Sequence, residues 1–236
     1  MENQAVEHLG VTLKQHYKVE CFDKYGKFKW VEEFDNRVST VGLNKYLDAT
    51  LKTGLAAPAW YVGLVGPTQS DGAMTAASGI LTSAAGAFSS ADVGQPITVK
   101  GAGTAGADLN TTVASYQSAT QVTLTAVAGT SVTGAGYLLG CRLADTMASH
   151  APWTESTPYS GNRPAFTPGT IAAGSVDNSG SKAVFTINAG ATVYGAFLND
   201  AASGTAGILL GMGPFSASRA VLSGDTLNVT ITCSLS

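Results

Sequence analysis

The sequence predicts a mainly all-β protein: a β-sandwich or jelly-roll-like domain with one short helix and an inserted small β module. Two observations lead to this fold class. Short runs of alternating apolar and polar residues recur along the chain, separated by residues that favour turns. Only one segment, at about residues 40–52, has helical spacing. Strands at regular intervals joined by turns are typical of sandwiches and jelly rolls rather than of βαβ folds.

A β-hairpin is predicted at the start of the chain. Residues 14–22 and 26–34 are rich in aromatic and β-branched residues, and the turn between them ends in Gly26. Phe28, Trp30 and Glu32 fall on one face of the second run. We therefore expect one face of the hairpin to lie against a core.

A helix and a buried strand are predicted next. The helix at about 40–52 follows the capping candidates Ser39 and Thr40 and closes at Gly54, with apolar residues at approximately helical spacing. Residues 60–65 are a continuous apolar run of the kind found in buried strands. That strand is expected to stop at Gly66-Pro67.

Composition changes abruptly after Gly66. Residues 1–66 hold eight of the thirteen Lys and Arg residues, whereas 67–140 contains one lysine, three aspartates and mostly Ala, Gly, Ser, Thr and Val. Within that block the expected strands are 95–99, 111–116 and 121–125. We interpret 67–140 as a small β module that projects outward from a split domain made of residues 1–66 and 141–236.

The C-terminal part returns to alternation after an irregular stretch. Strands are predicted at 183–188, 192–198, 206–210 and 226–233, with Gly224-Asp225 as the turn before the last one. Between Asp145 and Pro164 the sequence predicts a long ordered loop that Trp153 and Tyr159 hold in place. Long irregular loops are uncommon unless they are functional or belong to an interface.

The totals argue against several classes of partner. A formal net charge of −3 has the wrong sign for a protein that neutralises phosphates, so no nucleic-acid partner is expected. No apolar run is long enough for a membrane-spanning helix, and the first residues lack the basic and apolar regions of a secretory signal. We expect a soluble protein made in the cytoplasm, with no membrane partner.

Cys21, Cys141 and Cys233 are predicted to be reduced and buried.

No motif indicates a reaction, a cofactor or a metal. Residues 101–106 match G-x-G-x-x-G, but no helix follows, so we interpret them as a glycine turn. His150 lies near Asp145 and Glu155 without a nucleophile elbow or a metal-ligand spacing, which favours a structural or interfacial role. Glu32 and Glu33 are adjacent in a strand and point to opposite faces, so they cannot form a glycosidase pair. The chain is predicted not to be an enzyme.

Many short matches resemble structural proteins of tailed bacteriophages, close in character to capsid decoration or cement proteins. The resemblance covers about residues 14–66 and 141–236. Its matching segments are Tyr17 to Trp30, Asn36-Arg37-Val38, Gly42-Leu43, Trp60 to Leu64, Asp145-Thr146-Met147, Trp153-Thr154-Glu155, Tyr159-Ser160, Arg163-Pro164, Gly195 to Leu198 and Gly224 to Leu227. The block from Phe88 to Gly103, with Ala119 to Leu124, is similar to modules of phage tail fibres, tail spikes and other appendages.

The resemblance implies a non-enzymatic virion protein that binds the outer surface of the capsid and stabilises it. Its expected partners are the major capsid protein and further copies of itself in a dimer or trimer. Because Trp, Tyr and Arg dominate interface energetics, the interface candidates are Trp30, Trp60, Trp153, Tyr159 and Arg163. Two alternatives stay open: an appendage protein whose inserted module binds a host receptor or glycan, and a polysaccharide-degrading enzyme that would need Asp92 and Asp108 as its acids.

Overall fold

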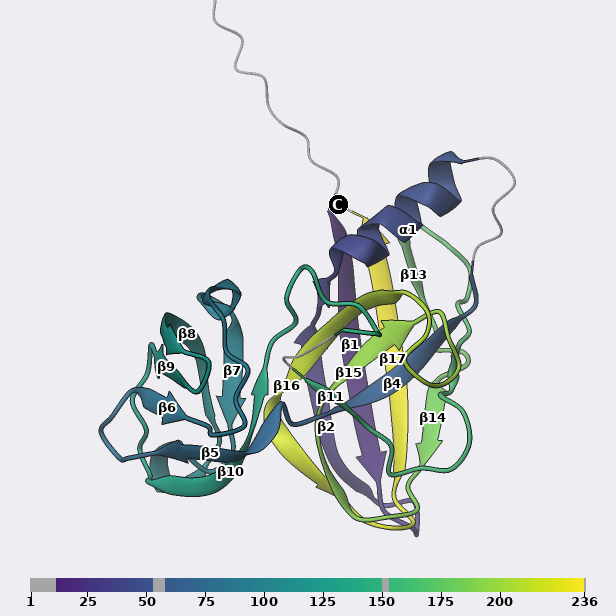
Figure 1. The fold of residues 1–236 in the computed structure, drawn as a ribbon. Coiled ribbons are helices and arrows are strands. Elements are labelled where there is room, and N and C mark those ends of the chain that lie inside the picture. The colour runs from purple at the N-terminus through teal and green to yellow at the C-terminus, as the bar shows by residue number, and fades with distance from the viewer. Residues whose placement is uncertain (1–11, 53–57, 150–152, 236) are drawn as a thin grey trace, which may run out of the picture.

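The computed structural model describes residues 12–52, 58–149 and 153–235. About half of the chain lies in strands, and α1 (Thr40–Leu51) is the one α-helix among the described residues. Figure 1 shows two units side by side, a β-sandwich that carries both ends of the described chain and a smaller barrel. The predicted all-β fold with one short helix is confirmed.

Two antiparallel sheets form the sandwich. In the first, the strand order is β13 (Ser175–Asp177), β17 (Thr226–Leu235), β1 (Leu13–Phe22) and β2 (Phe28–Asp35), and β14 (Ala183–Thr186) also pairs with β17. In the second, the order is β11 (Thr154–Ser156), β4 (Trp60–Gly66), β15 (Ala191–Asn199), β16 (Leu209–Val221) and β3 (Arg37–Val38), and β12 (Ala165–Phe166) also pairs with β4.

The predicted hairpin is confirmed as β1 and β2, which pair antiparallel with Cys21 opposite Trp30. The face assignment holds for Trp30, which packs against the core, and for Glu32, which is buried while Glu33 is exposed. It is wrong for Phe28, which is 52% exposed. Asp23 shapes the turn, since its carboxylate accepts hydrogen bonds from the backbone N–H groups of Tyr25 and Lys27.

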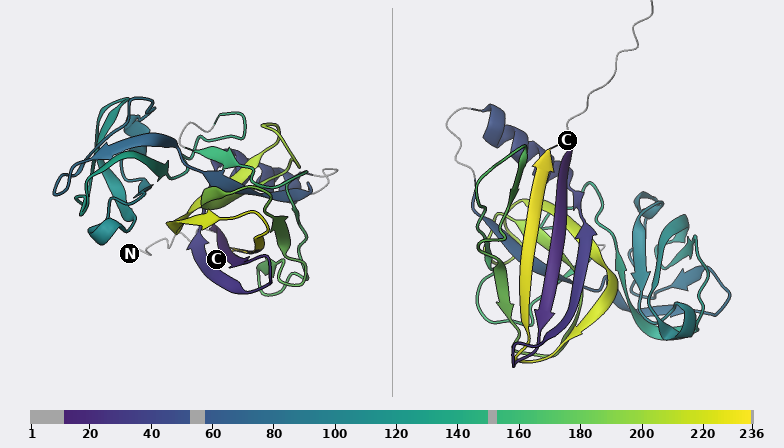
Figure 2. Two further views of the ribbon diagram at one scale, coloured as in Figure 1. Left: turned by 90° about the horizontal axis from the view of Figure 1, so that it is seen from below. Right: turned by 180° about the vertical axis from the view of Figure 1, so that it is seen from behind.

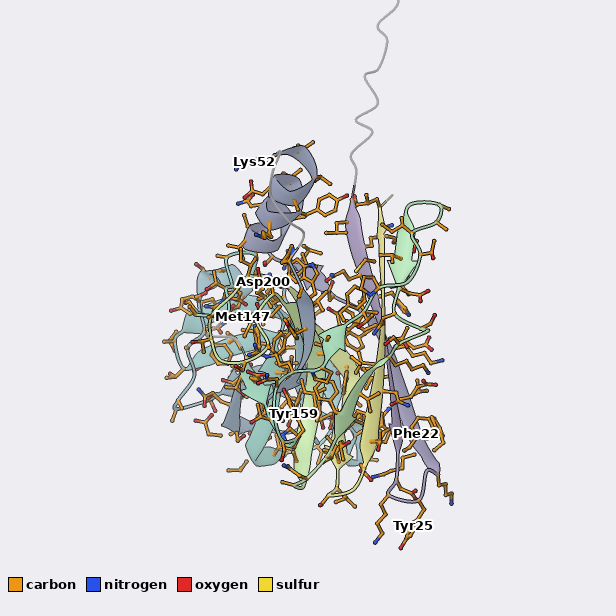
Figure 3. All side chains as sticks on the ribbon, turned by 90° about the vertical axis from the view of Figure 1, so that its right-hand side faces the viewer. Phe22, Tyr25, Lys52, Met147, Tyr159 and Asp200 are labelled. Atoms are coloured by element: carbon orange, nitrogen blue, oxygen red, sulfur yellow. The ribbon has the colours of Figure 1, made fainter. Side chains whose placement is uncertain are left out.

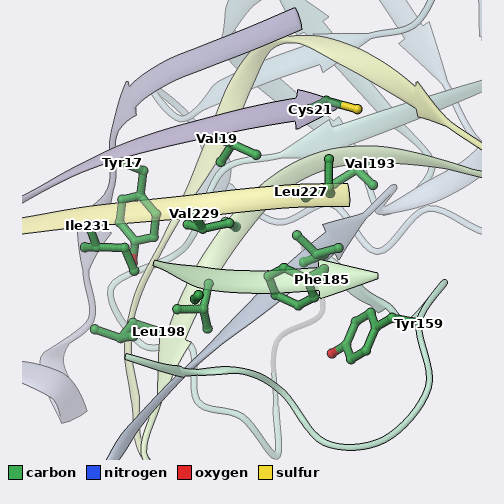
Figure 4. Close-up of a cluster of buried hydrophobic side chains, with 14 of the residues drawn as sticks. Tyr17, Val19, Cys21, Tyr159, Phe185, Val193, Leu198, Leu227, Val229 and Ile231 are labelled. Carbon is green, nitrogen blue, oxygen red and sulfur yellow. The ribbon is translucent and has the colours of Figure 1, made fainter. Parts of the chain in front are cut away.

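The sandwich core fills the space between the two sheets. Alternate residues of β1 and β17 point inward from one sheet, and Leu64 and Leu198 point inward from the other. Figure 4 shows Tyr17, Val19, Val229 and Phe185 in this cluster. On β1 and β17 each inward position alternates with a more exposed one, which is the pattern of a half-buried strand. Most of β4 and β15 is buried on both faces.

Residues 69–139 form a closed barrel of six strands. Its order is β10 (Val132–Leu139), β5 (Gln69–Met74), β6 (Ile80–Thr82), β9 (Gln121–Leu124), β8 (Leu109–Ser118) and β7 (Pro96–Val99), and the pairing of β7 with β10 closes the ring. A separate hydrophobic cluster, including Leu81, Val99, Val122 and Tyr137, fills its interior. Three of these strands, β7, β8 and β9, were predicted from the sequence, whereas β5, β6 and β10 were not.

Side-chain hydrogen bonds among the described residues tie the barrel to the sandwich. Arg142 donates to both carboxylate oxygens of the buried Asp92, and Asp108 accepts from the backbone N–H of Ser218 at 2.7 Å. Arg142 also donates to the carbonyl of Ala87. Further contacts join Arg37 to Gln95, Asn110 to the carbonyl of Ser216, and Lys100 to Thr192. The barrel therefore lies beside the sandwich, as both views in Figure 2 show. The contacts to Ser216 and Ser218 join it to β16.

Two predicted boundaries were wrong. The strand expected at 206–210 begins only at Leu209, and it then continues to Val221. The stretch from Asp145 to Pro164, predicted as a loop, contains the short strand β11, and β12 follows directly; both pair with β4. Strands of two or three residues are too short to show alternation in a sequence. Their pairing with β4 is visible only in the structure.

Candidate assembly interface

The five interface candidates do not form a common surface. Trp153 is 1% exposed, and its ring centroid lies 5.1 Å from that of Phe197 inside the chain. Tyr159 is also buried and packs edge-on against Phe185, with a centroid distance of 4.9 Å. Burial raises the pKa of Tyr159 far above its ordinary value. These two residues hold the 153–166 segment in place, as the sequence predicted for the loop.

Arg163 is buried and fully engaged within the chain. Its guanidinium forms a two-pronged pair with Glu155, with N–O distances of 2.7 and 2.6 Å. It also donates to the carbonyls of Ala201 and Gly204. The expectation that Trp153, Tyr159 and Arg163 face a partner is thereby corrected, because they have almost no exposed surface.

Trp30 and Trp60 are half-buried and lie on different strands. Trp30 packs edge-on against Phe215, and the guanidinium of Arg219 lies 5.8 Å from its ring. Trp60, at the start of β4, lines a groove beneath α1. Of the five candidates, Trp60 is the one that lies at an open apolar surface.

The helix α1 carries an exposed apolar stripe. Leu43, Leu47 and Leu51 are 39, 50 and 77% exposed and recur every fourth residue, so they lie along one side of the helix. Leu143 is also exposed, and its carbonyl accepts a hydrogen bond from Thr40 at the first helical turn. We call these four side chains the leucine ridge. Four exposed leucines on and beside one helix make this surface the candidate for an interface.

The opposite side of α1 is held tightly against β16. Ser39 caps the helix by accepting from the N–H of Gly42 at 3.1 Å, while its hydroxyl donates to the carbonyl of Leu209. A Cβ atom at Gly42 would lie 2.5 Å from the carbonyl oxygen of Leu210, so only glycine allows this close approach. The leucine ridge therefore projects from a firmly seated first turn.

An apolar groove of about 480 Å³ lies under the same helix. Tyr46 and Ala49 of α1 line one wall. Trp60 and Leu198 of one sheet and Cys233 of the other also line the groove. The described residues thus leave this end of the sandwich core incompletely covered. Together with the leucine ridge, the groove places exposed apolar surface on two sides of one helix.

A second exposed cluster lies at the other end of the sandwich. Tyr25 is 82% exposed at the tip of the β1–β2 turn, and the Lys24 ammonium lies 5.0 Å from its ring. Phe28 and Leu222 are exposed beside it. Figure 3 shows Tyr25 and the α1 residue Lys52 at opposite ends of the molecule.

The acidic residues considered for catalysis have structural roles. Glu32 accepts from the backbone N–H and the hydroxyl of Ser216 and pairs with Arg219. Asp92 is buried, pairs with Arg142 and closes a capping box with Ser89. Each carboxylate is thus occupied by donors from its own chain.

The glycine-rich segment 101–106 is a turn, as predicted. Gly101 and Gly106 have φ values of +72° and +79°, and Asp108 accepts from the N–H of Gly101 at 3.0 Å. The N–H of Gly101 is thus engaged by a carboxylate of the same turn. His150 lies outside the described residues.

Within the described part of the chain, no cluster of three His, Cys, Asp or Glu side chains has a geometry suited to a metal ion. The same residues contain no helix with the length and apolar character needed to cross a bilayer. Cys21 and Cys141 are buried and Cys233 is half-buried, and all three are free thiols. Burial raises the pKa of Cys21 to about 11.

The leucine ridge was not identified from the sequence. Leu43, Leu47 and Leu51 contributed to the helical spacing that predicted α1, but the spacing alone could not assign them to the solvent side. The signal present in the sequence was a second stripe, Gly42, Tyr46 and Ala49, on the other side of the same helix.

Comparison with family models, curated proteins and solved structures found no match to this chain.

Proposed function

We propose that this chain is a non-enzymatic structural protein of a tailed-bacteriophage virion. It binds the outer surface of the capsid as a decoration or cement protein, after synthesis in the host cytoplasm. The sequence resemblance to phage structural proteins supports the class of protein. The leucine ridge on α1 carries the proposal, because it is an exposed apolar surface on a helix that Ser39 caps and whose first turn packs against β16.

The ridge fits an apolar recess on the major capsid protein. Complete burial of a leucine side chain contributes about 1.5–3 kcal/mol, so several ridge residues supply the core of a modest interface. Self-association into a dimer or trimer would place several ridges on one shell at a high effective concentration. Many weak contacts can then hold the shell together.

Binding to shells is the direct test. Expanded empty capsids that lack the protein are mixed with purified chain, and co-sedimentation and the melting temperature of the shell are measured. We expect saturation at a fixed ratio to the capsid subunit and a raised melting temperature. The double variant Leu47→Lys/Leu51→Lys is expected to bind at least about tenfold more weakly, which corresponds to about 1.4 kcal/mol.

Val127→Lys is the matched control, because Val127 is an exposed apolar residue on the barrel, far from the ridge in sequence. It should bind like the unmodified chain. If the unmodified chain does not bind shells, the capsid role is rejected. If all three proteins bind equally well, the ridge is not the attachment surface.

The alternative is an appendage protein whose barrel binds a host glycan or receptor. One observation favours it: Tyr116 on β8 is 40% exposed, and its neighbour Gln117 is held by hydrogen bonds to Ser115 and Thr123. An exposed aromatic ring beside fixed polar groups suits a sugar. Binding of the chain to a glycan array that Tyr116→Ala abolishes, without binding to shells, would select this function.

A further inference from the structure

A polar cleft of about 720 Å³ lies where the barrel meets the sandwich. The barrel contributes Ser70, Lys100 and residues 131–136 to its lining, and β15 of the sandwich contributes Thr192 and Tyr194. Positions 192 and 194 are two apart on one strand, so both side chains lie on the same face of β15. The volume of the cleft lies within the range of pockets that bind small ligands.

Two glycines shape the barrel wall of this cleft. Gly134 has a φ of +66°, and a Cβ atom at this position would meet no atom within 4 Å. A Cβ atom at Gly136 would instead collide with the hydroxyl group of Tyr194. The carbonyl of Gly136 accepts a hydrogen bond from the backbone N–H of Lys100 at 2.9 Å. The barrel therefore approaches the sandwich closely at Gly136 and leaves open space beside Gly134.

Lys100 supplies the charge of the cleft. It is the one Lys or Arg residue in 67–140, and it is the only charged residue among the described residues that line the cleft. Its ammonium group donates to the Thr192 hydroxyl at 3.3 Å. None of the ion pairs in the described part of the chain includes Lys100. Because an ammonium group has three donors, two of them are available to a ligand.

Asp108 is held by backbone donors and does not pair with Lys100. One carboxylate oxygen accepts from the N–H of Gly101 at 3.0 Å, and the other accepts from the N–H of Ser218 at 2.7 Å. Burial and, to a smaller extent, the charge of Asp108 raise the pKa of Tyr194 to about 12, so its hydroxyl group stays protonated at neutral pH. The lining of the cleft therefore carries one positive charge and no negative charge.

The remaining lining has the chemistry that a sugar requires. The hydroxyl groups of Ser70, Thr133 and Thr192 can each donate and accept a hydrogen bond, as the hydroxyl groups of a sugar do. Pro67 and Val132 add apolar surface for the C–H face of a sugar ring. A phosphate is more often bound by arginine or by a helix N-terminus, and the described lining contains neither. One ammonium group among hydroxyl groups favours a carboxylate on a hydroxyl-rich ligand.

We propose that this cleft binds a carboxylated sugar unit of an acidic polysaccharide, with the carboxylate at Lys100 and the sugar hydroxyl groups at Ser70, Thr133 and Thr192. The site requires both units, because Lys100 belongs to the barrel and Thr192 to the sandwich. It is separate from the leucine ridge and from Tyr116, which does not line the cleft. Binding of the sugar is thus independent of binding to capsids.

Titration of the full chain with defined sugars, followed by NMR, tests the site. Trigalacturonate and 3′-sialyllactose are the carboxylated probes, and the methyl ester of trigalacturonate and lactose are their neutral counterparts. We expect at least one carboxylated probe to shift the backbone amide signals of Gly134 and Gly136 saturably, and its neutral counterpart to bind at least about tenfold more weakly, because hydrogen bonds to charged groups are the stronger ones.

Substitutions of lysine locate the binding. Lys100→Gln is expected to weaken the carboxylated probe about tenfold or more, whereas Lys100→Arg keeps the charge and should retain most of the binding. Lys27→Gln is the matched control, because it makes the same change of charge at an exposed lysine on the β1–β2 turn and should bind like the unmodified chain. Lys100 is exposed, and the amide spectrum of each variant shows directly whether it is folded.

Three results would overturn the proposal. The first is that neither carboxylated probe shifts the signals of the cleft. The second is equal binding of a carboxylated probe and its neutral counterpart, which would mean that the cleft does not recognise the carboxylate. The third is an equal loss of binding in Lys100→Gln and Lys27→Gln, which would assign the effect to the overall charge. Capsids are absent from these titrations, so failure here leaves the binding to shells to be judged by its own test.

Discussion

At the scale of single residues, buried arginine side chains form ion pairs and hydrogen bonds between segments that are not paired as strands. Arg163 links β11 to the 200–204 turn, and Arg142 links the strand end after β10 to Asp92 in the barrel. Breaking one side of such a pair leaves an uncompensated charge, which costs more than the pair itself contributes.

Arg163→Ala is expected to lower the free energy of unfolding by about 3 kcal/mol, because it removes the partner of Glu155 and two carbonyl contacts. Urea denaturation measures the change. Lys182→Ala is the control, since its pair with Glu20 is more exposed and should contribute about 1 kcal/mol or less. Equal effects of the two substitutions would contradict this role of Arg163.

Asp71 is expected to make stability depend on acid pH. Hydrogen bonds from the Ser83 hydroxyl and the Ala85 N–H lower its pKa below the ordinary value of 3.8. Its contribution is therefore complete above pH 3.8 and is lost as the pH falls through the lowered folded value. Asp71→Asn should remove this part of the slope in melting temperature between pH 5 and 2. An unchanged slope would show that other carboxylates govern it.

At the scale of elements, α1 depends on its contact with β16 more than on its own sequence. A twelve-residue helix is marginal in isolation. Ser39 and Gly42 attach its first turn to Leu209 and Leu210, while its leucines face outward. The first turn of α1 therefore attaches the helix to β16, and its leucines stay exposed.

Gly42→Ala should destabilise the protein although alanine is the better helix former. The new methyl group would meet the Leu210 carbonyl at 2.5 Å, and such overpacking costs about 1–3 kcal/mol, against a helix-propensity gain of about 1 kcal/mol. Chemical denaturation measures the difference. Gly180→Ala, which meets no atom within 4 Å, should change stability by no more than about 0.5 kcal/mol. A stabilised Gly42→Ala protein would mean that the first turn can move away from β16.

At the scale of the whole molecule, the barrel leaves and re-enters the sandwich at one place. Thr68 donates its N–H to the carbonyl of Tyr137 at 2.6 Å, and its hydroxyl accepts from the N–H of Leu139. The two connecting segments therefore lie together, and the sandwich strands β4 and β15 pair without any barrel residue.

Replacement of Gln69–Leu139 by a short Gly-Ser linker is expected to leave a folded sandwich, because each unit has its own hydrophobic cluster. The shortened protein should keep a cooperative thermal transition, with a lower melting temperature because the pairs made by Arg142 and Arg37 are lost. Circular dichroism and calorimetry check this outcome. A shortened chain without a cooperative transition would show that the two units fold as one.

Much of the fold was predictable where the information is local. The hairpin, α1, the buried strand β4, three barrel strands and the strands β14, β15 and β17 were predicted from alternation, helical spacing and turn residues. The same local signals predicted the turns at Gly26, Gly101 and Gly224, where the backbone φ is positive.

The sequence by itself determined the all-β class, the position of the helix α1, the change of composition at Gly66 and the opposite faces of Glu32 and Glu33. Only the tertiary structure decided that β10 closes the barrel against β7, that Trp153 and Arg163 are enclosed, and that the leucines of α1 face outward. The reason is physical. A local pattern specifies which residues share a face, whereas burial of that face depends on segments that are distant in the chain.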